Sequence, residues 1–204
     1  MNELLFKCPA SIVLSGASFS GKSFFLRRVI ENKMFDKPID KIFYCYGTWS
    51  RDYDDIKGVT FIQGIPDNFT SMYGPKHNLV CFDDLQDSLT QNVVNIFTKE
   101  SHHRNLSCVL ILQNLFLDSK FCRTISLNSH YTVLFRNPRA ASQYRILASQ
   151  TGHKHLMQAF QDAMRIDRFG YLVIDASPHG DPNYRLRTRI FPGDDCVIYQ
   201  SQNV

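Results

Sequence analysis

Residues 16–23 read Gly16-Ala17-Ser18-Phe19-Ser20-Gly21-Lys22-Ser23, and this stretch decides the fold. It fills every fixed position of the phosphate-binding loop (P-loop) pattern G-x-x-x-x-G-K-[ST]. An apolar run, Ser11–Ser15, predicts a strand before it, and a helical pattern follows from Lys22. In this order, backbone N–H groups and the positive end of the helix dipole point at phosphate oxygens. We therefore expect Lys22 to reach the β- and γ-phosphates of a nucleoside triphosphate, and the Ser23 hydroxyl to ligate Mg²⁺.

The bulk composition fits one α/β domain that spans residues 1–204. The chain is 44% hydrophobic and 21% charged, which is enough for one sizeable core. Its formal net charge of +4 permits contact with nucleic acid but does not by itself argue for it. No apolar run is long enough to span a membrane, so we expect no membrane partner. The six cysteines form no C-x-x-C pair, which predicts a reduced intracellular compartment without zinc or disulfides.

Strand and helix patterns alternate along the chain. We predict strands at Ser11–Ser15, Lys41–Gly47, Val59–Gln63, Asn78–Asp83, Leu106–Gln113, Tyr131–Phe135, Tyr171–Asp175 and Leu186–Phe191. We predict helices at Lys22–Lys33, Gln86–Glu100, Ala140–Gln150 and Lys154–Arg165, with a short turn near Lys120–Ile125. Several strands are continuously apolar, as in a parallel sheet covered on both faces. The pattern predicts a three-layer α/β sandwich with a mostly parallel sheet, and the last two strands as an antiparallel hairpin at its edge.

Two carboxylates end one predicted strand, Asn78–Asp83. A P-loop enzyme needs a carboxylate at the tip of a neighbouring strand to hold the metal and its water shell, and Asp83 is placed for that role. Asp84 follows directly and is our candidate for the general base that polarises the attacking water. The alternative is that the pair only caps the helix expected near Gln86.

A polar amide follows the apolar strand that starts at Leu106. Gln113 can donate and accept hydrogen bonds without changing charge, which suits a sensor of the γ-phosphate or the attacking water. The alternative is that Gln113 merely ends the strand. The chain order of P-loop, acidic strand and glutamine strand predicts one further strand between the first two. This is the layout of the additional-strand (ASCE, RecA-like) P-loop NTPases.

The middle of the chain resembles a known family. The tract Phe97–Ser107, which contains Ser101-His102-His103-Arg104, is similar to the FtsK–HerA class of pumping ATPases. Within that class it is most similar to the genome-packaging ATPases of large DNA viruses of the poxvirus type and of Polinton or Maverick elements, including adintoviruses. The likeness continues through Arg123–Tyr131 and Leu134–Arg139 and into the terminal strands, so it covers nearly the whole chain.

The resemblance implies hydrolysis of ATP with Mg²⁺ to drive double-stranded DNA into a capsid. It also implies a homo-oligomeric ring, hexameric or pentameric, that acts on capsid proteins and DNA in the host cytoplasm or nucleus. Ring ATPases usually complete each site with an arginine from the neighbouring subunit. We expect Arg104 in that role, with Arg123 and Arg136 as further candidates, and a solvated side chain as the alternative for each. His102 and His103 are expected at the surface or against the DNA backbone.

Other functions remain open at this stage. A nucleotide or small-molecule kinase would need an arginine-rich lid, but the Arg185–Arg189 run alternates as a strand does. A GTPase would need an N-K-x-D motif after the D-x-x-G match at Asp55–Gly58, and none follows. An ATP-binding assembly scaffold without turnover is opposed only by Asp84 and Gln113. Extra DNA-gripping domains of cellular pumps do not fit in this length, so DNA binding is expected to be weak, sequence-independent and salt-sensitive.

Overall fold

The computed structural model describes residues 2–67, 71–101, 104–115, 119–153, 155–178 and 180–200. The strands are β1 Ser11–Ser15, β2 Lys41–Tyr46, β3 Thr60–Gln63, β4 Asn78–Asp83, β5 Leu106–Leu112, β6 Tyr131–Phe135, β7 Tyr171–Asp175, β8 Leu186–Thr188 and β9 Val197–Tyr199. The α-helices are α1 Lys22–Glu31, α2 Gln91–Asn95, α4 Lys120–Asn128, α5 Ala141–Thr151 and α6 Leu156–Ile166. A π-helical turn, η5, spans Ile96–Glu100, and 3-10 turns occur at η1 Asn2–Leu4, η2 Arg51–Tyr53, η4 Gln86–Ser88 and η6 Pro182–Tyr184. His102 and His103 lie outside the described residues.

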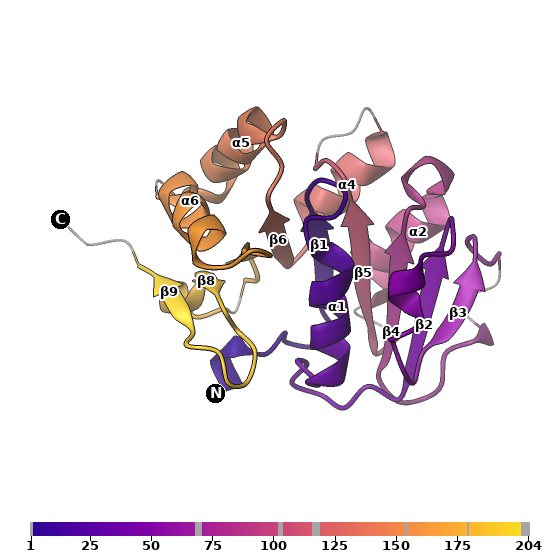
Figure 1. Cartoon of the computed structure of the whole chain (residues 1–204). Helices are drawn as coiled ribbons and strands as arrows, with labels where there is room; N and C mark the ends of the chain where they lie inside the picture. Colours follow the sequence, from indigo (N-terminus) through magenta and orange to yellow (C-terminus); the bar gives the residue numbers. More distant parts are fainter. Residues whose placement is uncertain are drawn as a thin grey trace.

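One nine-stranded sheet runs through the molecule in the order β3-β2-β4-β5-β1-β6-β7-β8-β9 (Figure 1). The strands from β3 to β6 are parallel, and β7, β8 and β9 are each antiparallel to the strand before them. β5 lies between β1 and β4, which confirms the additional strand expected between the P-loop strand and the acidic strand. The fold is a mixed α/β P-loop NTPase fold.

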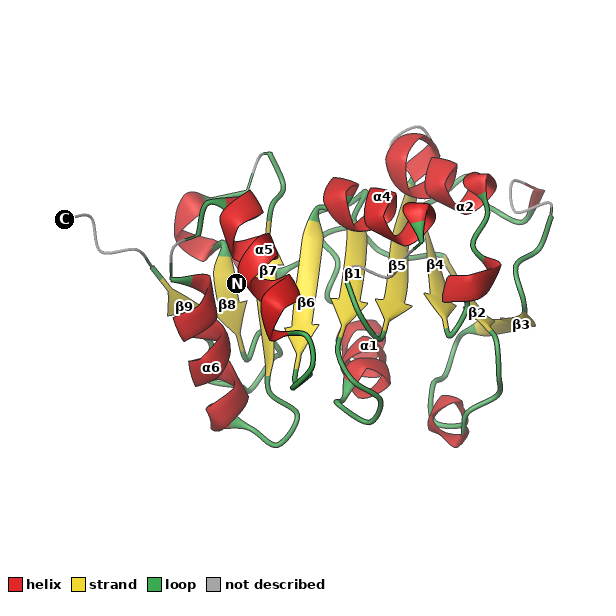
Figure 2. Ribbon diagram, turned by 90° about the horizontal axis from the view of Figure 1, so that it is seen from above, coloured by secondary structure: helices red, strands yellow, loops and turns green. Residues whose placement is uncertain are grey.

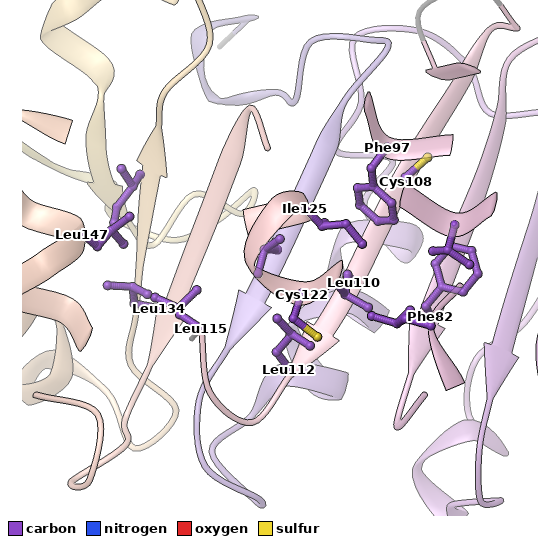
Figure 3. Close-up of a cluster of buried hydrophobic side chains, with 14 of the residues drawn as sticks. Phe82, Phe97, Cys108, Leu110, Leu112, Leu115, Cys122, Ile125, Leu134 and Leu147 are labelled. Carbon is purple, nitrogen blue, oxygen red and sulfur yellow. The ribbon is translucent and has the colours of Figure 1, made fainter. Parts of the chain in front are cut away.

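Helices cover both faces of the sheet (Figure 2). α1 lies on one face, and α2, α4, α5 and α6 lie on the other. Side chains along β1 alternate between the two cores: Val13 packs in the core beneath α4–α6, and Ile12 and Leu14 pack in the core beneath α1. Figure 3 shows the first of these cores, where Leu110 of β5, Ile125 of α4 and Leu134 of β6 belong to one buried cluster. Burial on both faces explains why these strands are continuously apolar.

The helix expected over Gln86–Glu100 is wrong as one element. The structure breaks it into η4, α2 and the π-helical turn η5. The break comes at Leu89 and Thr90, which adopt extended backbone angles, and Leu89 is buried in the core. The predicted short turn near Lys120 is instead the full helix α4, whose first turn is capped by Ser119 Oγ accepting from the Cys122 N–H at 3.4 Å.

The carboxyl-terminal strands also differ from expectation. β8 stops at Thr188, before the predicted Phe191, because Arg189 takes a left-handed φ of 53° that cannot continue a strand. β7 and β8 do form an antiparallel pair, but β9 adds to β8 and occupies the edge. None of the described helices is both long and apolar enough to cross a lipid bilayer.

Candidate active site

The P-loop follows β1 at the carboxyl edge of the parallel strands. The Gly16 N–H donates to Leu112 O at 3.2 Å, and the Ala17 N–H donates to Arg136 O at 3.2 Å. These bonds attach the loop to the ends of both strands beside β1, namely β5 and β6. Gly21 takes a φ of 101° and ends the loop, and Lys22 begins α1. The loop is therefore fixed at its start by the sheet and at its end by the helix.

Lys22 lies within the loop that it belongs to. Its Nζ donates to Gly16 O at 2.7 Å and to Ala17 O at 2.8 Å, and its side chain is buried. Burial lowers the pKa of Lys22, and the negative charge of Asp83 opposes that shift. Among the described residues, two carbonyl oxygens accept hydrogen bonds from this buried ammonium group. An anion bound in the loop would stabilise its positive charge, so Lys22 is suited to bind phosphate.

Asp83 ends β4 with its carboxylate held by two tyrosines. Tyr44 Oη donates to Oδ2 at 2.8 Å, and Tyr53 Oη donates to the same oxygen at 2.9 Å. Burial raises the pKa of Asp83, and the tyrosine hydrogen bonds and the charge of Lys22 counteract the rise. Both tyrosines use Oδ2, which leaves Oδ1 for another ligand. The Ser23 hydroxyl lines the same cavity, and a carboxylate oxygen together with a hydroxyl is a donor set that suits Mg²⁺.

Asp84 is exposed and has a left-handed φ of 55°. Its carbonyl oxygen approaches β2 so closely that a Cβ added to Gly47 would lie 2.2 Å from it, while the Gly47 N–H bonds Asp83 O at 3.0 Å. The following turn, η4, has Leu85 at its N-cap without a side-chain cap bond. The capping alternative for the two carboxylates is therefore wrong for this turn.

Gln113 follows β5 directly, and its side chain is exposed. Asn137 Nδ2 donates to Gln113 O at 2.9 Å and to Asn114 Oδ1 at 3.1 Å. The amide side chain of Asn137, placed after β6, thus holds the backbone at the end of β5. The side chain of Gln113 remains available to a ligand.

One cavity of about 980 Å³ brings most of the predicted residues together. Lys22, Ser23, Asp83, Asp84 and Gln113 all line it, as do Ser18, Phe19 and Gly21 of the loop. The reason is topological: the parallel strands β1, β4 and β5 end at the same edge of the sheet, so residues that follow them meet there.

The arginine candidates do not line this cavity. Arg104 precedes β5, so the seven-residue strand separates it from Gln113 by roughly 20 Å. Arg136 lines a separate groove, and its guanidinium donates to Met164 O at 2.5 Å. Arg123 is exposed on α4. Arg104 is therefore too far away to reach a ligand bound in the cavity of its own chain.

Besides Arg27, which pairs with Asp55, the cavity has two cations that sequence reasoning missed, Arg51 and Arg168, and the exposed ring of Phe169. Neither arginine has an acidic partner among the residues that the structure describes. Arg168 and Phe169 precede β7, and β7 begins at this edge because it is antiparallel to β6, with Tyr171 opposite Phe135. The direction of β7 is the signal that would have placed them here.

Comparison of the sequence with protein-family models and with curated proteins gives no match. Solved structures do match. The genome-packaging NTPase B204 of Sulfolobus turreted icosahedral virus 2, in complex with sulfate, aligns with 95% of this chain and 97% of its own at 12% identity and a TM-score of 0.56. Its ATP-gammaS complex aligns over 96% and 98% at 12% identity, with a TM-score of 0.53. B204 of Sulfolobus turreted icosahedral virus, described as a DNA-packaging ATPase, aligns over 96% and 99% at 11% identity, with a TM-score of 0.55. At these identities, the likeness shows a shared fold.

Proposed function

We propose that this chain is an ATP-hydrolysing motor subunit that packages double-stranded DNA into a capsid. The observation that supports ATP hydrolysis is that one cavity is lined by Lys22, Ser23, Asp83, Asp84 and Gln113. The packaging role is supported by the FtsK–HerA-like tract in the sequence and by the fold shared with B204.

Each of these cavity residues has a separate role in the proposed hydrolysis of ATP. The loop N–H groups and Lys22 hold the phosphates, with Lys22 Nζ exchanging its two carbonyl partners for phosphate oxygens. Ser23 and Asp83 would hold Mg²⁺, which supplies charge neutralisation at the β- and γ-phosphate oxygens. Gln113 is placed to orient the attacking water or to sense the γ-phosphate.

Asp84 fits the general base better than Asp83. Asp83 is buried and already accepts two tyrosine hydrogen bonds, so it is positioned to hold Mg²⁺ rather than to take a proton. Asp84 is exposed to the cavity, and its carboxylate accepts no hydrogen bond from any described residue. It can therefore take a proton from a water placed against the γ-phosphate.

A ring of identical subunits would bring an arginine of one chain to the active site of the next. Arg104 is remote from the chain's own cavity, so we propose that it stabilises transition-state charge at the site of the next subunit. The mild positive charge of the chain is consistent with weak, sequence-independent contacts to the DNA backbone. We place this motor inside the host cell, acting on capsid proteins and double-stranded DNA without a membrane partner.

The test is phosphate release from ATP with and without double-stranded DNA, over a series of salt concentrations. We expect turnover that DNA stimulates, with the stimulation lost as salt rises because phosphate contacts weaken. Lys22→Ala should abolish it. Binding of ATP without turnover, even with DNA and capsids, would favour a scaffold, and transfer of the γ-phosphate to an acceptor other than water would favour a kinase.

A further inference from the structure

Three arginines, Arg27, Arg51 and Arg168, line the cavity of the candidate active site. Arg27 Nη1 pairs with Asp55 Oδ2 at 2.9 Å, so its charge is already partly balanced. Arg51 and Arg168 have no acidic partner within the part of the chain that the structure describes. A guanidinium of this kind matches the geometry of phosphate oxygens. The position of each arginine along the sheet then determines which part of a nucleotide it can contact.

The order of the strands places Arg51 on the side of the cavity where the γ-phosphate is expected. Asp84 and Gln113, the proposed base and sensor, follow β4 and β5, which lie on one side of β1 (Figure 1). Arg51 follows β2, which is the strand next to β4 on that same side. Arg168 precedes β7, on the other side of β1. Of these two arginines, Arg51 is therefore the one closer to the reacting phosphate.

The backbone that carries Arg51 is attached to the site itself. Arg51 begins the 3-10 turn η2, which ends at Tyr53, and Tyr53 Oη donates to Asp83 Oδ2 at 2.9 Å. The side chain of Tyr53 is buried. Two residues further along, Asp55 makes its ion pair with Arg27 of α1. The turn is thus held on one side by the carboxylate that ends β4 and on the other by the helix that follows the P-loop.

The side chain of Arg51, in contrast to its backbone, is exposed and faces this cavity. The turn is capped at its start, where Ser50 Oγ accepts from the Asp52 N–H at 3.3 Å. A guanidinium on a fixed backbone needs little reordering to form parallel hydrogen bonds to phosphate oxygens. The γ-phosphate would bring negative charge into a cavity that the carboxylates of Asp83 and Asp84 also line, so a cation on this side would stabilise it.

We propose that Arg51 binds the γ-phosphate of a nucleotide in its own chain, and that this contact makes the site prefer a triphosphate to a diphosphate. A diphosphate lacks the group that Arg51 binds, so Arg51 adds nothing to its affinity. The contact comes from within the subunit and is separate from the role proposed for Arg104 at the neighbouring site. The proposal rests on the proposed function, since it needs the phosphates of the nucleotide on the P-loop.

The test compares the affinities of AMPPCP, a non-hydrolysable triphosphate, and of ADP, each with Mg²⁺, for the full chain and for Arg51→Ala. We expect Arg51→Ala to weaken AMPPCP binding about ten- to hundredfold, as loss of a charge-assisted hydrogen bond does, and to leave ADP binding unchanged. Arg51→Lys keeps the charge without the planar fork, so its loss should be smaller. Lys57→Ala is the control: Lys57 is an exposed cation of the same β2–β3 connection that does not line the cavity, so both affinities should stay as they are.

The outcomes separate this proposal from the proposed function. An unchanged affinity of Arg51→Ala for AMPPCP, or an equal loss for both nucleotides, would overturn the γ-phosphate contact while the phosphate site stands. If the wild type binds neither nucleotide, the proposed function is wrong, and this proposal is wrong with it.

A mixing experiment tests whether Arg51 acts within its own chain. Arg51→Ala and Lys22→Ala should each impair hydrolysis at the site of the chain that carries the change. Mixed rings should therefore regain no ATPase activity, which is the opposite of the behaviour expected for Arg104. Recovery of activity on mixing would show that Arg51 acts at a neighbouring subunit, contrary to the proposal.

Discussion

The hydroxyl of Tyr53 donates a hydrogen bond of 2.9 Å to Oδ2 of Asp83 and so ties the turn after β2 to the carboxylate that ends β4. Because this bond stabilises the ionised form, it lowers the pKa of Asp83 against the effect of burial. Tyr53→Phe should therefore raise that pKa further. We expect the acidic limb of the pH profile of kcat/KM for ATP hydrolysis to move up by about one pH unit.

Tyr46→Phe is the matched control for this measurement. Tyr46 belongs to the same aromatic group, with its ring centroid 5.9 Å from that of Tyr53, but it makes no hydrogen bond to Asp83 among the described contacts. Its pH profile should match the wild type. A profile of Tyr53→Phe that coincides with the control would show that Asp83 ionisation does not limit turnover.

Burial of Asp83 predicts a gain in stability when its charge is removed. Its pKa is raised in the folded protein. Between the ordinary aspartate pKa and this raised value, the folded protein holds a proton that the unfolded chain has released, so stability falls as pH rises through that window. Above the raised pKa the full cost of burying the charge is present. Asp83→Asn keeps an oxygen that accepts from both tyrosines but carries no charge.

We expect Asp83→Asn to raise the melting temperature of the nucleotide-free chain at pH 7, by roughly 2–4 °C for each kcal/mol removed, and to abolish hydrolysis. Calorimetry checks this, and the gain should shrink as pH falls below the raised pKa. A variant that melts below the wild type at pH 7 would show that the carboxylate is stabilised in place, contrary to the burial argument.

Replacement of the proposed base should separate binding from chemistry. Asp84→Asn keeps the shape and the cavity contacts but cannot accept a proton, so ATP affinity should hold while turnover falls about 10²- to 10⁴-fold. Equilibrium binding and single-turnover hydrolysis measure the two quantities. Asp87→Asn is a control in the exposed turn η4 and should hydrolyse normally. Wild-type turnover in Asp84→Asn would show that another group serves as the base.

The position of Arg104 predicts complementation between defective subunits. Arg104→Ala should bind ATP but not hydrolyse it, and Lys22→Ala should fail to bind it. In mixed rings, the intact loop of one variant meets the intact arginine of the other at a fraction of the interfaces. We therefore expect mixing to restore part of the ATPase activity. An inactive mixture would exclude action of Arg104 at a neighbouring subunit, and Arg51→Ala would then test an arginine of the chain's own cavity.

The predictable part of the site is the part determined by local pattern and parallel strands. The P-loop, Asp83, Asp84 and Gln113 each follow a strand whose apolar run is visible in the sequence, and parallel strands bring their carboxyl ends to one edge. Motif order predicts that one further strand lies between β1 and β4, and the structure shows that this strand is β5.

The rest depends on contacts that no local pattern contains. Phe169 reaches the cavity only because β7 runs antiparallel to β6, which is a long-range pairing. β9 was missed because its three half-buried residues, Val197–Tyr199, give too short a pattern to predict a strand. The helix predicted over Gln86–Glu100 breaks where Leu89 turns into the core, so tertiary burial outweighs the local preference.

The close approach of Gly47 to the carbonyl of Asp84 has a consequence for recognising distant relatives. Any side chain at position 47 would displace the backbone that carries Asp84, so loss of this glycine and loss of hydrolysis should go together. A homologue that keeps its P-loop but has a larger residue where β2 ends is then expected to be a nucleotide binder that has lost its enzymatic activity. One position, far from the P-loop in the sequence, can thus sort active homologues from degenerate ones in a genome survey.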